Sequence, residues 1–420
     1  MRDRRGCELL HQSVRSINDF IRIDEGKEVF TQNGYRNGVS ADGHSNGSVR
    51  IDNPQRAIDI ERHSPANLHP VPAVKEQRGQ LRGVGVVGLG YWGPNWVRNF
   101  HQSQAAHRIV ACDLLEKRRT HVSQLYSIET TSRFEDLLND SDIEGIVVAT
   151  PVGTHYAMAR RALEAGKSVL VEKPLAMSTE EAGELVQIAQ ERNLVLMVGH
   201  TFEYSAPVLK MRDIIGSGEL GDVFYISSVR ANLGLFQRDV NVTWDLATHD
   251  ISIILNLMGG RMPEAVSCQA EGHYGHGVED VAMLTLRFER NVIAFIHVSW
   301  LDPDKIRRTT VVGSRKMLVY DDTAPQEKIR IYDKGVTAQK YYDTFGEFQF
   351  SYRYGDIQIP RIEEKEPLYC ECEHFVNCVR NGETPNTDGV NGARVVSVLE
   401  AANYSLRRGG LMVPLGNALR

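Results

Sequence analysis

Short apolar segments alternate with longer periodic segments between residues 84 and 198. Because each apolar run is too short for a buried helix, we predict strands at residues 84–87, 108–113, 145–149, 168–171 and 194–198. Apolar residues that return every three or four positions predict helices between them, for example at 156–165 and 179–192. Strands that alternate with helices at this spacing indicate an α/β fold with a doubly wound parallel sheet.

The first eighty residues have a different pattern. Roughly three in ten are apolar, and residues 31–48 are mostly Asn, Gly and Ser, so we predict a flexible or disordered tail at 1–80 with room for one short helix at 8–23. Arg4 and Arg5 suggest a twin-arginine export signal, but His11, Arg15 and Asp19 interrupt the apolar stretch that such a signal needs. We therefore disfavour export and assign the tail no function.

Composition excludes several classes of protein. The chain has 420 residues, 42% of them hydrophobic and 24% charged, which is typical of globular domains and not of a collagen, a coiled coil or a disordered chain. A net charge of −6 disfavours nucleic-acid binding, and no apolar stretch approaches the roughly 18–20 residues of a membrane span. Six cysteines in so long a chain favour a reducing compartment, so we expect a cytoplasmic protein without membrane or nucleic-acid partners.

A glycine motif follows the first predicted strand. Gly88, Gly90 and Gly93, with Tyr91 and Trp92 between the last two, form a Gly-x-Gly-x-x-Gly sequence. The first glycine allows a tight turn, the second allows close approach of a pyrophosphate, and the third allows close helix packing. We therefore predict a dinucleotide-binding site.

An acidic residue stands at the end of the second predicted strand, about twenty residues past the last glycine. The carboxylate of this residue, Asp113, would accept the ribose hydroxyls of NAD and repel the 2′-phosphate of NADP. Lys117, Arg118 and Arg119 lie close enough in sequence to receive that phosphate. NAD is therefore the favoured cofactor, and NADP remains the alternative.

Polar residues follow several of the predicted strands, where ligands of open α/β sheets bind. Lys173 follows a strand directly and precedes Pro174, so it is a candidate catalytic residue, although an isolated lysine at a strand end is more often a surface residue. The remaining candidates are cofactor ligands at Thr150, Pro151, His155 and Glu172 and substrate ligands at His200 and Tyr204.

Asp245 and His249 form a second candidate site. They are four positions apart, so in a helix they would share one face, and apolar residues at 251–258 would anchor that helix. A carboxylate one turn before an imidazole could orient it or raise its basicity. The alternative is an exposed ion pair on a helix surface.

These motifs together resemble the Gfo/Idh/MocA oxidoreductases, the group of glucose–fructose oxidoreductase and inositol dehydrogenase. The similarity covers the chain from about residue 81 and includes the glycine motif, Ala149-Thr150-Pro151, Glu172-Lys173-Pro174, Asp245-x-x-x-His249 and the segments 371–375 and 399–402. It implies an NAD-binding Rossmann domain at 81–201 and an α+β domain at 202–420, with an open, largely antiparallel sheet that binds a sugar or cyclitol and builds a homodimer or homotetramer. Period-two patterns agree with such a sheet at residues 223–231, 265–270, 282–288, 292–299, 308–312 and 317–320.

The resemblance also assigns the catalytic residues. The family's lysine, aspartate and histidine correspond to Lys173, Asp245 and His249. In the oxidation of a secondary alcohol, His249 would accept the hydroxyl proton and Lys173 would stabilise the developing alkoxide. Asp245 would orient His249 or bind a neighbouring hydroxyl.

Two other segments allow alternative interpretations. Arg230 and Arg238 flank a polar loop and could bind a phosphate or carboxylate of the substrate. The cysteines and histidine of residues 370–378 suggest zinc, but an apolar helix pattern runs through them, so we predict a helix and no metal site. The aromatic residues at 341–354 are expected to pack against a strand edge or at a subunit interface.

The favoured function is NAD-dependent oxidation of the 3-hydroxyl of a nucleotide-linked hexose, because residues 91–95 and 244–250 most resemble members from nucleotide-sugar and antibiotic-sugar pathways. An inositol or other cyclitol dehydrogenase, or a ketosugar reductase, is the alternative within the enzyme class. A non-catalytic NAD-sensing regulator is the alternative of another class. Such a regulator would be expected to lack the lysine or the histidine, and both are present here.

Overall fold

The structure is a computed structural model that describes residues 79–237, 240–274, 277–338 and 350–415. Nearly all of the predicted tail, including the helix expected at 8–23, lies outside these residues, as does Arg238. Among the described residues, no helix is long and apolar enough to span a bilayer.

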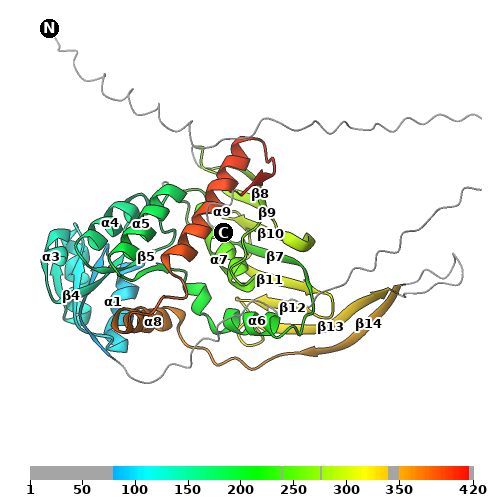
Figure 1. Cartoon of the computed structure of the whole chain (residues 1–420), viewed down its shortest axis with the longest axis horizontal. Coiled ribbons are helices and arrows are strands. Elements are labelled where there is room, and N and C mark those ends of the chain that lie inside the picture. Colours follow the sequence, from blue (N-terminus) through cyan, green and yellow to red (C-terminus); the bar gives the residue numbers. More distant parts are fainter. Residues whose placement is uncertain (1–78, 238–239, 275–276, 339–349, 416–420) are drawn as a thin grey trace, which may run out of the picture. The chain divides into compact units, whose positions relative to one another are not determined.

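The first sheet has six strands in the order β3-β2-β1-β4-β5-β6, and every neighbouring pair is parallel (Figure 1). The predicted strands are all present, and the three-residue β3 adds one that the sequence analysis did not expect. The strand order reverses between β1 and β4, which is the point where α/β sheets bind ligands. The bounds are β1 Leu81–Val87, β2 Ala106–Cys112, β3 Glu129–Thr131, β4 Ile143–Val148, β5 Ser168–Glu172 and β6 Leu196–Gly199.

Helices cover both faces of this sheet, which explains why its strands are apolar on both sides. The helices between its strands are α1 Gly93–Ser103, α2 Glu116–Tyr126, α3 Phe134–Asn139, α4 His155–Glu164 and α5 Thr179–Glu191. Ser178 caps α5, as expected, by accepting a hydrogen bond from the backbone of Glu181. A later helix, α8 (Pro367–Asn381), packs against α1 and brings Phe375 against Gly145 of β4.

The second sheet has nine strands in the order β14-β13-β12-β11-β7-β10-β9-β8-β15. Its neighbours are antiparallel except for β7 and β10, so the predicted α+β domain with a largely antiparallel sheet is confirmed. The sequence analysis expected β7 to β12 but not β13, β14 or β15. The bounds are β7 Val223–Ala231, β8 Ala265–Glu271, β9 Val281–Arg287, β10 Ile293–Ser299, β11 Ile306–Gly313, β12 Met317–Asp321, β13 Ile329–Ala338, β14 Phe350–Gln358 and β15 Val413–Pro414.

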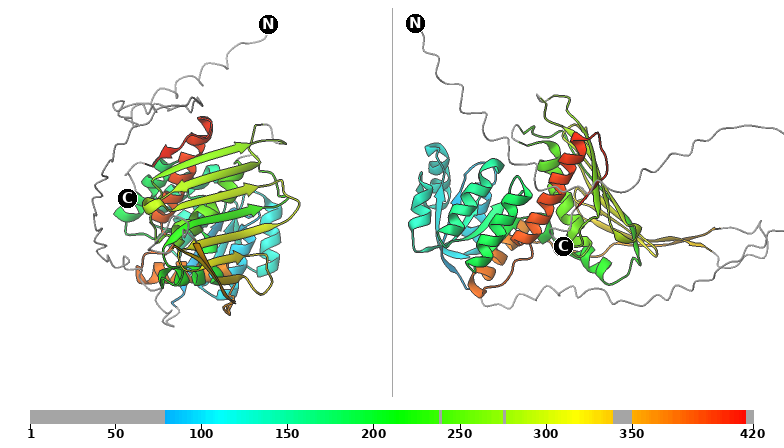
Figure 2. Two further views of the ribbon diagram at one scale, coloured as in Figure 1. Left: turned by 90° about the vertical axis from the view of Figure 1, so that its right-hand side faces the viewer. Right: turned by 45° about the horizontal axis from the view of Figure 1, so that its top comes forward.

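Helices cover one face of the second sheet (Figure 2). They are α6 Ala206–Gly216, α7 Thr248–Leu257 and α9 Gly389–Arg407. Helix α9 contacts both sheets: a Cβ atom on Gly392 would lie 2.5 Å from Val198 of β6, and Ser405 accepts a hydrogen bond from Cys268 of β8. The elements that carry the predicted site, β5, β6, α7 and β7, are therefore held together by one continuous core. The predicted boundary near residue 201 stays a prediction.

Candidate active site

The glycine turn after β1 has the shape that a bound dinucleotide needs. Gly88 has a φ of +91°, and a Cβ atom there would lie 2.5 Å from the carbonyl oxygen of Ala149. A Cβ atom on Gly93 would lie 2.0 Å from the carbonyl oxygen of Gly88. At Gly90, by contrast, a Cβ atom would meet nothing within 4 Å, so the turn is open where a pyrophosphate would approach. Tyr91 and Trp92 hold exposed rings beside this opening.

Asp113 follows β2 and is buried against the same turn. Its Oδ2 accepts a hydrogen bond of 2.7 Å from the backbone N–H of Leu89, and its Oδ1 accepts one of 2.8 Å from that of Leu115. Arg118 lies 3.3 Å from the same carboxylate, and Arg119 donates to the carbonyl oxygen of Asp113. Asp113 thus fixes the glycine turn, while Arg118 and Arg119 place positive charge beside it.

The loops after β4 and β5 are joined through His155. This buried imidazole lies 2.8 Å from the carbonyl oxygen of Thr150 and 2.7 Å from that of Pro174. Pro151 precedes the short helix η1 (Val152–Thr154) in the first of these loops. His155 therefore sets the distance between the loop that carries Thr150 and Pro151 and the loop that carries Lys173.

Glu172 ends β5 and is buried. Its Oε1 accepts a hydrogen bond of 2.7 Å from the indole of Trp96 in α1, and its Oε2 accepts one of 3.2 Å from the backbone of Lys173. Burial raises the pKa of the Glu172 carboxyl. These contacts give Glu172 a supporting position between α1 and Lys173.

Lys173 and Asp245 meet across the two sheets. The ammonium of Lys173 donates 2.8 Å to the carbonyl oxygen of Asp245 and lies 3.2 Å from its Oδ1. The other carboxylate oxygen, Oδ2, accepts a hydrogen bond of 3.1 Å from the indole of Trp300. An ammonium has three N–H donors, so among the described residues one donor of Lys173 remains without an acceptor.

The sequence analysis expected His249 and Asp245 to share one face of an α-helix. The structure does not place both residues in one α-helix. Residues Thr243–Ala247 form a π-helix, η3, and α7 begins only at Thr248. Asp245 lies in this π turn and His249 in the first turn of α7. The carboxylate of Asp245 bonds to Lys173 and Trp300, and none of the hydrogen bonds of the described residues joins it to His249.

The imidazole of His249 is held in its neutral form. Burial lowers its pKa well below 6.5, and the positive charge of Lys173 and then of Arg230 lowers it further. Its Nδ1 is buried without a hydrogen-bond partner, and its ring packs at 5.0 Å, edge to face, on Phe202. A neutral imidazole can accept a proton, which is what a general base requires.

His200 lies directly after β6 and is 1% exposed. Neither of its ring nitrogens has a hydrogen-bond partner in the part of the chain that the structure describes, and burial, with Lys173 as a second cause, lowers its pKa to about 3. Buried polar atoms without partners are rare in proteins and often mark a ligand position. Tyr204, the other predicted substrate residue of this segment, instead lies 3.1 Å from the hydroxyl of Thr387.

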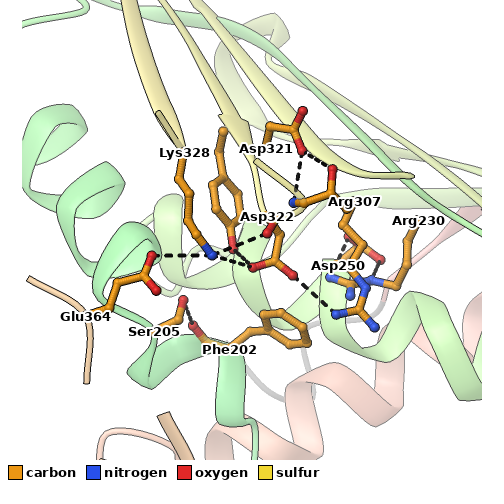
Figure 3. A network of polar contacts seen from close by, with 11 residues as sticks. Phe202, Ser205, Arg230, Asp250, Arg307, Asp321, Asp322, Lys328 and Glu364 are labelled. Carbon is orange, nitrogen blue, oxygen red and sulfur yellow. Dashed lines mark hydrogen bonds and ion pairs between the residues drawn. The ribbon is translucent and has the colours of Figure 1, made fainter. Parts of the chain in front are cut away.

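Arg230 belongs to a buried polar network (Figure 3). Its Nε donates a hydrogen bond of 2.7 Å to Oδ2 of Asp250, and the hydroxyl of Ser228 donates one to Oδ1 of the same carboxylate. The side chains of Arg230 and Asp250 are both almost fully buried. The guanidinium carbons of Arg230 and Arg307 lie 4.5 and 5.8 Å from the centre of the Phe202 ring. This pairing favours a supporting role for Arg230 behind Phe202 and His249 over direct contact with a substrate anion.

Four residues of this site escaped the sequence analysis. They are Phe202, Asp250, Trp300 and Arg307. A usable signal existed for Trp300, because it follows a predicted strand as directly as Lys173 does. The partner of Asp250 could not be read from the pattern, because Asp250 lies on helix α7 and Arg230 on strand β7.

The cysteine-rich segment is helical, as predicted. Cys370, Cys372, His374 and Cys378 all lie on α8. Among the described residues, no group of three or more His, Cys, Asp and Glu side chains is arranged to hold a metal ion.

The fold and this site define a two-domain, NAD-binding oxidoreductase. Residues 82–200 match the model of an oxidoreductase family with an NAD-binding Rossmann fold, and residues 208–319 match the model of the GFO/IDH/MocA C-terminal domain. The chain belongs to the Gfo/Idh/MocA family of oxidoreductases, as its motifs indicated.

Two curated relatives align over most of this chain. A scyllo-inositol 2-dehydrogenase (NAD⁺) of Bacillus subtilis is 26% identical over 77% of this chain and 94% of its own length. A UDP-N-acetylglucosamine 3-dehydrogenase of Acidithiobacillus ferrooxidans is 27% identical over 75% of this chain and 94% of its own length. The two act on different substrates, so relatedness alone does not select one.

Solved structures share the fold. GenD2 from gentamicin A biosynthesis, in complex with NAD, has a TM-score of 0.68 at 23% identity and covers 84% of this chain and 99% of its own. The Acidithiobacillus ferrooxidans UDP-N-acetylglucosamine 3-dehydrogenase has a TM-score of 0.64 at 22% identity and covers 78% of this chain and 98% of its own.

Proposed function

We propose that this dehydrogenase oxidises a secondary hydroxyl of a ring polyol to a ketone, and that its preferred substrate is the 3-hydroxyl of a nucleotide-linked hexose. The observation that carries the proposal is the position of Lys173. Its ammonium is tied to Asp245 through two contacts and keeps one donor for a ligand oxygen. The neutral imidazole of His249 stands in the same buried region and interacts electrostatically with that ammonium.

Lys173 provides the electrostatic part of the reaction. Bound NAD would accept the hydride at its nicotinamide ring. The free N–H of Lys173 donates to the substrate oxygen, on which negative charge builds as the proton leaves. Its side chain is only 12% exposed, so this charge interaction is poorly screened by water.

His249 provides the proton transfer. In the oxidation it accepts the hydroxyl proton, and in the reverse direction the protonated ring returns it. The lowered pKa keeps the ring neutral and ready to accept that proton. Asp245 acts on Lys173, because its carboxylate and carbonyl oxygens hold the ammonium.

His200 supplies a binding group for a neighbouring hydroxyl. A neutral imidazole offers one donor and one acceptor, and both nitrogens of His200 lack partners among the described residues. A pyranose or cyclitol has hydroxyls on adjacent carbons, so one could reach Lys173 and His249 while the next reaches His200. This pattern supports a ring polyol over a simple alcohol.

The choice of a nucleotide-linked hexose rests on the resemblance of residues 91–95 and 244–250 and on the UDP-N-acetylglucosamine 3-dehydrogenase among the relatives. The test is a panel of UDP-hexoses, free sugars and inositols incubated with NAD or NADP, with the absorbance of the reduced cofactor as readout. Turnover of a UDP-hexose but not of inositols supports the proposal. Turnover of scyllo- or myo-inositol alone refutes the substrate and supports the cyclitol dehydrogenase.

We also propose that the uncovered face of the second sheet joins two or four copies of the chain. Its central strands expose Tyr225, Met283 and Phe295, whose neighbours on the opposite face are buried. Single exposed apolar residues are common, but three on adjacent strands form a contiguous patch. The test is light scattering after size-exclusion chromatography: Phe295→Glu should dissociate the oligomer, and a monomeric wild-type protein would refute the proposal.

A further inference from the structure

Trp300 connects the second sheet to the catalytic pair. It follows β10 directly, its side chain is 1% exposed, and its indole N–H donates 3.1 Å to Oδ2 of Asp245. The other oxygen of that carboxylate, Oδ1, lies 3.2 Å from the ammonium of Lys173. Each oxygen of Asp245 therefore has its own partner.

This division matters for the number of donors that Lys173 can offer. Two of its three N–H groups point at Asp245, one at the carbonyl oxygen and one at Oδ1. Without the indole, Oδ2 would be a free anionic acceptor next to the third N–H. A carboxylate can bind an ammonium through both oxygens, and this arrangement would remove the donor that the substrate oxygen needs.

The indole is fixed so that it can hold this position. The backbone N–H of Trp300 donates 2.9 Å to the carbonyl oxygen of Asp280, and its own carbonyl accepts 3.0 Å from Gly234. A Cβ atom on Gly234 would lie 3.0 Å from Cδ1 of the indole, so the chain passes close to the ring at this position. The ring of Phe236 packs against it at 5.5 Å.

We propose that Trp300 is a positioning residue: it occupies Oδ2 of Asp245 and so keeps one N–H of Lys173 free for the substrate oxygen. The proposal rests on the proposed dehydrogenase function and adds a residue that none of the family motifs contains. Trp300 therefore acts in the catalytic step, because the free donor of Lys173 is needed most when negative charge develops on the substrate oxygen.

The chain offers a matched control. Trp244 is adjacent to Asp245 in sequence and is also buried, but its indole nitrogen has no hydrogen-bond partner among the residues that the structure describes. Trp300→Phe and Trp244→Phe therefore make the same chemical change, and only the first removes a bond to Asp245. A hydrogen bond to a charged group corresponds to a factor of about 10 to 100 in rate, so kcat of Trp300→Phe should fall by that factor.

The kinetics are measured with the substrate that the wild-type protein oxidises, together with its analogue deuterated at the reacting carbon. For Trp300→Phe we expect a lower kcat, an equal or larger isotope effect, and an affinity for NAD and a melting temperature close to those of Trp244→Phe. A merely structural role would instead lower the melting temperature and the NAD affinity below those of Trp244→Phe. A kcat within twofold of Trp244→Phe would overturn the proposal.

A second measurement needs no substrate. The chain has four tryptophans, so the indole N–H region of a ¹⁵N–¹H NMR spectrum is simple, and Trp300→Phe assigns one signal. In Asp245→Ala the signal of Trp300 should move upfield and that of Trp244 much less, because only the former loses a charged acceptor. An unmoved Trp300 signal would overturn the positioning role even if the dehydrogenase function holds. Conversely, a wild-type protein without turnover on any substrate would refute the proposed function. The indole signal would still test the hydrogen bond between Trp300 and Asp245 in that case.

Discussion

Replacement of Lys173 by alanine tests the proposed chemistry most directly. The change removes the donor for the developing alkoxide and leaves the carboxylate of Asp245 with only Trp300 as a side-chain partner. Loss of one donor of this type lowers kcat by about 100- to 1,000-fold, or about 3–4 kcal/mol of transition-state stabilisation. The low exposure of the ammonium, 12%, places the expected loss at the upper end of that range.

NAD binding should survive this change, because the glycine turn from Gly88 to Gly93 and its support by Asp113 are untouched. The assays are steady-state turnover, by absorbance of the reduced cofactor, and calorimetric titration with NAD. Lys167 supplies a matched control: it is another largely buried lysine, whose ammonium donates to the carbonyl oxygens of Asp140 and Ile143. Lys167→Ala should lower stability and leave kcat within about twofold, since it removes no group from the site. If Lys173→Ala keeps more than a tenth of wild-type kcat, the role assigned to Lys173 is wrong.

Three further predictions concern pH and cofactor choice. Because the pKa of His249 is lowered well below 6.5, kcat for oxidation should stay level as pH falls through 6.5, and a decline centred at or above that value would show that this pKa is not lowered. Folding lowers the pKa of His200 from 6.5 to about 3. Between these pH values the unfolded chain carries a proton on this histidine and the folded chain does not, so the free energy of unfolding decreases as pH falls below 6.5. The free energy of unfolding of His200→Gln, measured with urea, should therefore fall by about 1.4 kcal/mol less per pH unit than that of the wild type between these pH values. Equal slopes would refute this prediction. Arg118→Ala should raise KM for NADP several-fold and leave KM for NAD nearly unchanged, because only NADP carries the 2′-phosphate; parallel changes would show that Arg118 does not face that phosphate.

The sequence predicted the first domain well because buried parallel strands and their glycine turn are local patterns. Residues at strand ends, such as Lys173 and His200, could be selected before their surroundings were known, since topology alone brings strand ends together. The hairpin of β13 and β14 was missed because its strands carry many polar residues and β14 is exposed along most of its length. Its pattern thus lacks the alternation that marks a half-buried strand.

The pairing of charges was beyond sequence reasoning. Asp245 was expected to orient His249 or to bind a neighbouring hydroxyl, yet its carboxylate contacts Lys173. Arg230 was expected to bind a substrate anion, yet Asp250 of the neighbouring helix neutralises it. Spacing along the chain shows which groups are available, whereas the partner of each depends on contacts between elements far apart in sequence.

The packing of α8 against α1 limits how this enzyme can be divided. The ring of Phe375 fills the place that a side chain at position 145 would take, so the nucleotide-binding half is completed by residues from near the end of the chain. A recombinant fragment that stops after β6 would leave that apolar surface open to water. A graft of this coenzyme module onto another substrate domain should therefore include α8, which covers that surface.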